Sequence, residues 1–129
     1  MALVIREMHA PTDGALLNEE WLVVENAGDA PVSVAGLRLT AQPPRGRPRD
    51  VATIDPGFTI KPGEKHRIVT GSASRPAHGR APDGPVPNYH LLLKTGYLQP
   101  DVVVRLLRNQ IALVTAVYDP KFPSGAREA

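Results

Sequence analysis

The chain has 129 residues, of which 42% are hydrophobic, 22% are charged and 5% are aromatic, and its formal net charge is +2. This length predicts one domain that removes about two-thirds of its unfolded surface from water, and the hydrophobic fraction excludes wholesale disorder. The absence of cysteine excludes disulfides and thiolate chemistry. No apolar run is long enough to span a membrane as a helix, and no signal-peptide core is present, so we expect a cytoplasmic protein with no membrane partner.

Short strand-like segments separated by turn signals follow one another along the chain. Fourteen Pro and eleven Gly fall mainly between the apolar runs, which is typical of a protein with many turns and few helices. The expected strands cover residues 2–8, 19–25, 32–41, 51–54, 64–70, 89–95, 102–108 and 110–118, with a further short extended segment at 58–60. This order predicts an all-β antiparallel sandwich of about eight or nine short strands.

Individual residues predict where strands bend or turn and where the domain ends. Gly36 lies where the apolar alternation of residues 32–41 changes phase, which predicts a bend or bulge. Asn109 separates the last two strands and is suited to a tight hairpin turn. Residues 1–118 are expected to form one domain with a flexible loop at 71–88, and residues 119–129 a loose tail anchored at most by Phe122.

The run from Asn18 to Gly71 resembles the lamin-tail domain family. The matching motifs are Glu20-Trp21, Asn26 with Gly28, Val32 to Gly36, Pro62-Gly63 and Thr70-Gly71. The resemblance covers about the first two-thirds of the chain and implies an immunoglobulin-like β-sandwich that docks other proteins. The matching Asn, Gly and Pro residues are expected to form turns, because each of these residue types favours particular turn conformations.

Catalytic and metal-binding patterns are not recognisable in the sequence. The four histidines, His9, His66, His78 and His90, have neither neighbouring cysteines nor ligand-like spacing. Glu19 and Glu20 are adjacent, so on a strand they point to opposite faces and cannot act as a carboxylate pair. We therefore predict a protein that is not an enzyme and has no catalytic residues, no cofactor and no metal.

Several strands carry more apolar residues than a solitary sandwich needs. If Leu22 and Val24 face the core, Trp21 and Val23 face outward on the same strand. The runs 91–93 and 102–104 likewise place apolar residues on both faces of a strand. The candidate protein interface is Trp21, Val23, Leu92 and Val103. We favour self-association as a homodimer, then docking of a protein partner, and then coverage by a loop or the tail of the same chain. The expected function is a non-catalytic interaction or scaffold domain.

Two Arg-rich loops give the alternative function, a nucleic-acid-binding module. Loop 42–50 contains Arg45, Arg47 and Arg49, and loop 71–88 contains Arg75 and Arg80. If both loops lie at one end of the sandwich, they form a basic rim that contacts phosphates and gives weak, salt-dependent binding. The other interpretation of these charges is a pair of solvated loops that keep the protein soluble.

A third hypothesis, an accessory carbohydrate-binding domain, needs an exposed aromatic platform. Trp21, Tyr89 and Tyr97 would supply that platform only if they converge.

Overall fold

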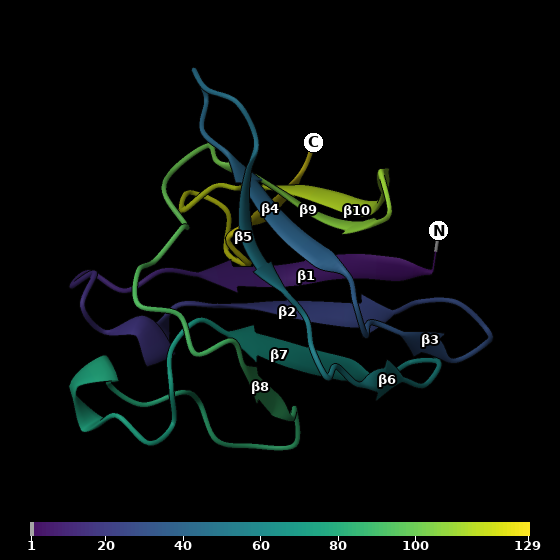
Figure 1. Cartoon of the computed structure of the whole chain (residues 1–129), viewed down its shortest axis with the longest axis horizontal. Helices are drawn as coiled ribbons and strands as arrows, with labels where there is room; N and C mark the ends of the chain where they lie inside the picture. Colours follow the sequence, from purple (N-terminus) through teal and green to yellow (C-terminus); the bar gives the residue numbers. More distant parts are fainter. Residues whose placement is uncertain (1) are drawn as a thin grey trace.

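The computed structural model describes residues 2–129 and places two β-sheets face to face (Figure 1). The four-stranded sheet has the order β1-β2-β7-β8, and the five-stranded sheet has the order β11-β10-β9-β4-β5. The strands of the first sheet are β1 (Leu3–His9), β2 (Trp21–Asn26), β7 (Lys65–Val69) and β8 (Asn88–His90). Those of the second are β4 (Arg38–Gln42), β5 (Arg49–Thr53), β9 (Val103–Arg108), β10 (Ile111–Tyr118) and β11 (Ala126–Glu128).

The remaining elements are short. β3 (Val32–Ser33) and β6 (Thr59–Ile60) pair into a two-stranded ribbon. Two single-turn 3-10 helices, η1 (Leu17–Glu19) and η2 (Pro76–His78), lie in the connections. Within residues 2–129, no helix is long and apolar enough to cross a membrane.

The predicted all-β sandwich is confirmed, with eleven strands among residues 2–129 in place of eight or nine. In this described part of the chain, every strand pair is antiparallel except β7 with β8, which is parallel. Gly36 has φ +79° in the turn between β3 and β4, so the expected strand 32–41 is two strands. Asn109 has φ +57° at the expected tight turn between β9 and β10.

Two expectations about the second half of the chain are wrong. The tail is not loose throughout, because residues 126–128 form β11 and pair with β10. The expected strand 89–95 ends at His90, because Leu92 has φ +61° and the backbone leaves the sheet there. The amides of Leu91 and Leu93 instead donate to the carbonyl oxygens of Val69 and Thr70.

The core lies between the two sheets and is built almost entirely from aliphatic side chains. Its fully buried members include Leu22, Leu37, Leu39, Ile54, Ile60, Ile68, Val104 and Leu106. Leu22 and Val24 of β2 both belong to this core cluster, whereas Trp21 and Val23 do not. The predicted inward and outward sides of β2 are therefore confirmed.

A buried carboxylate fixes the segment that crosses from the first sheet to the second. Glu20 is only 4% exposed and accepts hydrogen bonds from the Thr70 hydroxyl at 2.7 Å and from the backbone N–H groups of Tyr97 and Leu98, each at 3.2 Å. A buried carboxylate without donors would be strongly destabilising. These three donors therefore hold residues 97–98, and with them the start of β9, against the beginning of β2.

Replacing Glu20 with Gln should lower the free energy of unfolding by about 2–4 kcal/mol, because an amide has one acceptor oxygen where the site has three donors. Chemical denaturation would measure the change. Glu19→Gln is the matched control, since the Glu19 side chain is more exposed and the same chemical change should cost little there. Equal stability of the two variants would contradict this role of Glu20.

Burial and the negative charge of Glu20 raise the pKa of Tyr97 well above the ordinary tyrosine value. The Tyr97 hydroxyl should thus resist ionisation until the protein unfolds in alkali, and tyrosinate absorbance measured against pH would detect this. Because the folded pKa exceeds the unfolded one, the linked stability is full below pH about 10 and declines above it. Three tyrosines ionising together in the folded protein would refute this.

Candidate functional site

The outer face of the five-stranded sheet carries a run of polar side chains along β4. Side chains alternate along a strand, so Leu39 and Ala41 point into the core, where both are buried, and Arg38, Thr40 and Gln42 point outward. Their respective partners in the pairing with β9 are Leu107, Arg105 and Val103. Strand alternation and register therefore combine to place a polar strip across two neighbouring strands.

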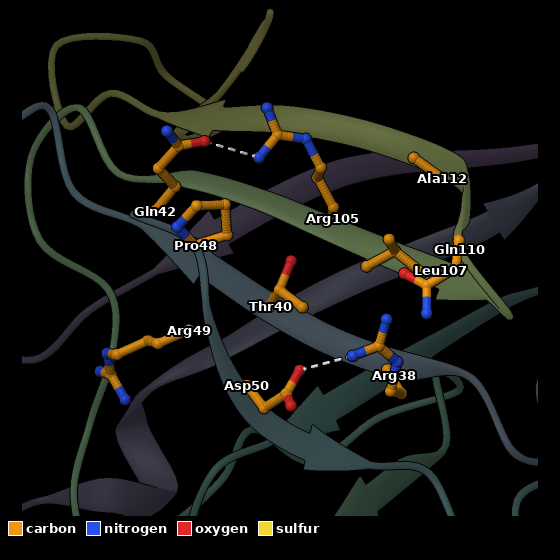
Figure 2. A pocket seen from close by; sticks show the side chains of 10 residues that line it. All are labelled: Arg38, Thr40, Gln42, Pro48, Arg49, Asp50, Arg105, Leu107, Gln110 and Ala112. Carbon is orange, nitrogen blue, oxygen red and sulfur yellow. Dashed lines mark hydrogen bonds and ion pairs between the residues drawn. The ribbon is translucent and has the colours of Figure 1, made fainter. Parts of the chain in front are cut away.

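These strands form the floor of a shallow groove of about 550 Å³ (Figure 2). Arg38 Nη1 donates a hydrogen bond to Asp50 Oδ1 at 2.9 Å, and Arg105 Nη1 donates to Gln42 Oε1 at 2.9 Å. Thr40 lies between these two pairs, and its buried hydroxyl oxygen has no hydrogen-bond partner among the described residues. The groove is also lined by Pro48, Arg49, Leu107, Gln110 and Ala112. The partner of Arg105 in this contact is a neutral amide, so the contact does not offset the positive charge of the guanidinium.

The β4–β5 hairpin ends in a tight turn just beyond this groove. Gly46 N–H donates to Pro43 O at 3.2 Å, and Gln42 Nε2 donates to Gly46 O at 3.1 Å. A Cβ on Gly46 would lie 2.6 Å from Pro43 Cγ, so the turn requires glycine. Pro44 fixes its own φ within the turn. Gln42 therefore joins the groove to the turn, because the same amide also accepts from Arg105.

Six arginines lie on this hairpin and on β9, and one of them, Arg108, donates to the carbonyl oxygens of Ser33 and Ala35 instead of joining the groove. The other five lie along the groove and the turn. We call them the basic face: Arg38, Arg45, Arg47, Arg49 and Arg105. Residues 43–50 are all exposed, and the hairpin end projects beyond the sheet at the top of Figure 1. Asp50 is the single acidic residue within 38–53 and 103–108, so the five arginines and Asp50 together carry +4. Since the chain as a whole carries +2, the remaining residues have a net charge of −2, and positive charge is concentrated here.

The two Arg-rich loops do not form the basic rim considered from the sequence. The end of the β4–β5 hairpin lies at the top of Figure 1 and the loop that carries η2 lies at its lower left, so the two are well separated. Arg80 is nearly fully exposed and lies 3.8 Å from Asp83, which partly offsets its charge. Arg75 lines a separate pocket with Lys94 and His78. Arg45, Arg47 and Arg49 are therefore brought to the basic face, and Arg75 and Arg80 are not.

Trp21, the first residue of the predicted apolar interface, is partly covered by its neighbours. The His9 ring stacks on the Trp21 ring with centroids 5.2 Å apart. The Arg67 guanidinium lies 5.0 Å from the centroid of the Trp21 ring, in cation–π contact. The indole is thus held between side chains of β1 and β7 on the outer face of the first sheet.

Val23 points outward as predicted but is fully buried, so the expectation that it adds to an exposed interface is wrong. Arg67 lies opposite Val23 in the pairing of β2 with β7. The Arg67 guanidinium also donates to Asn88 Oδ1 at 2.7 Å and to Pro82 O at 3.3 Å. Arg67 and loop 71–88 therefore screen this part of the sheet from water within a single chain.

The other two interface candidates lie on other elements than Trp21. Leu92 is 66% exposed in the loop after β8. Val103 is partly buried on β9, opposite Gln42 in the second sheet. The outer faces of the two sheets of a sandwich point in opposite directions, so Trp21 and Val103 do not share a surface. Nor do the aromatics build a platform, since Tyr97 is buried and the Tyr89 hydroxyl accepts from Gly57 N–H.

The histidines take up separate local contacts. His9 bonds to Glu19 O, and His90 bonds to Gly71 O, while His78 Nδ1 accepts from Ser72 N–H. His66 stacks on Phe58, and burial lowers its pKa. Within residues 2–129 no group of three or more His, Asp or Glu side chains is placed to hold a metal ion.

Arg38, Gln42 and Arg105 were not identified from the sequence as site residues. Each is a polar residue at an outward position of a largely apolar strand, and this local pattern is visible in the sequence. Their proximity to one another is not visible there, because it depends on β4 pairing with β9 about sixty residues later in the chain. No family model and no curated protein matches this chain. The lamin-tail resemblance therefore stays a prediction.

Replacing Gln42 with Ala should loosen the hairpin end without unfolding the protein. Loss of one net hydrogen bond, worth about 1 kcal/mol, corresponds to about fivefold faster tryptic cleavage after Arg45. Gln110→Ala is the control, because Gln110 lines the groove but has no hydrogen bond to the turn. Cleavage at the wild-type rate in the Gln42 variant would show that this amide does not hold the turn.

Proposed function

We propose that this protein is a non-catalytic nucleic-acid-binding domain that contacts phosphates through the basic face. The observation that supports this most directly is the gathering of the five arginines of the basic face around a single carboxylate, Asp50, in a chain of nearly balanced charge. Arginine presents several donors in a planar fork that matches phosphate oxygens. Phosphate contacts of this kind supply most of the sequence-independent affinity of nucleic-acid-binding proteins.

Three features of the basic face fit this function. Arg45, Arg47 and Arg49 are exposed, and none of the ion pairs in the described part of the chain involves them. Arg38 and Arg105 are held in place in the groove by hydrogen bonds, which reduces the conformational entropy lost on binding. The groove is shallow and open, as contact with an extended polyanion requires.

The apolar interface favoured by the sequence has less structural support. Val23 is buried inside the chain. The large hydrophobic residues that are most exposed are Leu92, Ile111 and Phe122, and they come from three separate segments. A stable homodimer generally needs a contiguous apolar patch. Self-association and protein docking therefore rank behind nucleic-acid binding as proposals.

Replacing Arg45, Arg47 and Arg49 with Ala should weaken binding to a short mixed-sequence DNA duplex by at least about tenfold at low salt. The slope of log affinity against log salt concentration should also fall by about 2–3, because each phosphate contact contributes about 0.9 to that slope on duplex DNA. Fluorescence anisotropy across a salt series measures both quantities.

The matched control removes the same number of charges elsewhere, as Arg75, Arg80 and Lys94 to Ala. It should leave affinity and salt slope close to those of the wild type. Thermal unfolding of both variants would verify that they fold. An unchanged affinity in the first variant, or equal losses in the two, would rule out the basic face as the binding surface.

A further inference from the structure

The end of the β4–β5 hairpin has a composition that simple phosphate binding does not require. Residues 44–48 read Pro-Arg-Gly-Arg-Pro, and all five are exposed. Two arginines therefore stand one residue apart on either side of a glycine, with a proline outside each of them. We call residues 44–48 the hairpin tip.

The tip is narrow and held in one conformation. Gly46 is fixed by its bond to Pro43 O and by the bond from Gln42, and the two flanking prolines restrict φ on both sides. Gly46 adds no side chain of its own between Arg45 and Arg47. The tip therefore presents two long cations on a thin, preformed turn that projects from the sheet (Figure 1).

We propose that the hairpin tip inserts Arg45 and Arg47 into the minor groove of A·T-rich duplex DNA. This inference rests on the proposed function and deepens it, because it names the nucleic acid and the groove. The minor groove of B-DNA is only about 6 Å wide, so it excludes a whole sheet or helix but admits a turn that leads with two arginines. A·T tracts narrow the groove further and strengthen its negative potential, which attracts inserted arginine.

Base preference follows from the same geometry. The minor-groove edge of an A·T pair offers only acceptors, which suit a guanidinium, whereas a G·C pair adds the amino group of guanine, which is a donor. Arginine is also more weakly hydrated than lysine, so it loses less on entering a narrow groove. Any cationic side chain can contact phosphates, but the preference for A·T base pairs requires the guanidinium of arginine.

The remaining members of the basic face fit a backbone role in the same complex. Arg38, Arg49 and Arg105 lie behind the tip, along the strands and the groove. With the tip in the minor groove, these side chains come next to the phosphates that border it. Prolines at a tip are also compatible with contact to the groove walls, since proteins that bind the minor groove often use apolar residues there.

The test measures anisotropy of the full chain with two duplexes of equal length, one A·T-rich and one G·C-rich. We expect the A·T-rich duplex to bind about tenfold or more tightly, in line with the discrimination that a base contact gives. A duplex RNA matched to the A·T-rich sequence should bind more weakly, because its minor groove is wide and shallow.

A double variant, Arg45→Lys with Arg47→Lys, keeps the charge and should lose the A·T preference while retaining affinity for the G·C-rich duplex. Arg75→Lys with Arg80→Lys is the matched control and should keep the preference. Equal salt-dependent binding to both duplexes, or an A·T preference that survives in the Lys variant, would overturn minor-groove insertion and leave the proposed function intact. No binding to any of these nucleic acids would overturn both.

Discussion

The position of the second sheet against the first depends on one buried carboxylate. Glu20 stands at the start of β2 and gathers donors from Thr70, Tyr97 and Leu98, which belong to two segments far apart in the sequence. The chain crosses between the sheets through residues 91–102 and then enters β9, the strand that carries Arg105. The placement of Arg105 beside β4 therefore follows from a polar contact some distance from the basic face, in a part of the molecule that is otherwise packed with aliphatic side chains.

Features that are decided within a few residues were predictable from the sequence, and features that depend on long-range strand pairing were not. Strand alternation and turn residues predicted the all-β sandwich, the bend at Gly36 and the hairpin turn at Asn109, because each is decided within a few residues. The strand at 89–95 was mispredicted because hydrophobicity does not report the left-handed backbone of Leu92. The candidate site was half predicted. Arg45, Arg47 and Arg49 are visible in the sequence, but their union with Arg105 depends on a strand pairing that no local pattern encodes.

The apolar excess has a related explanation. Val23 is an outward residue by alternation and a buried one in the fold, because Arg67 and the segment around Pro82 and Asn88 lie over it. Long polar side chains can cover apolar surface with their stems while their charged ends stay hydrated. A strand with apolar residues on both faces can therefore be covered by one arginine and a proline-rich loop of the same chain. Hydrophobic alternation alone does not distinguish such a covered strand from one that binds a partner.

The hairpin tip has little structural connection to the rest of the protein. Residues 44–48 are exposed, and apart from the strands that carry them they are tied to the fold by two hydrogen bonds of Gly46, one to Pro43 O and one from the Gln42 side chain. Substitutions in the tip, whether by evolution or by engineering, should therefore leave the packing of the core unchanged. In such an arrangement recognition and folding are nearly independent traits, so proteins with this sandwich could change their targets at the four tip positions other than Gly46 with little effect on stability.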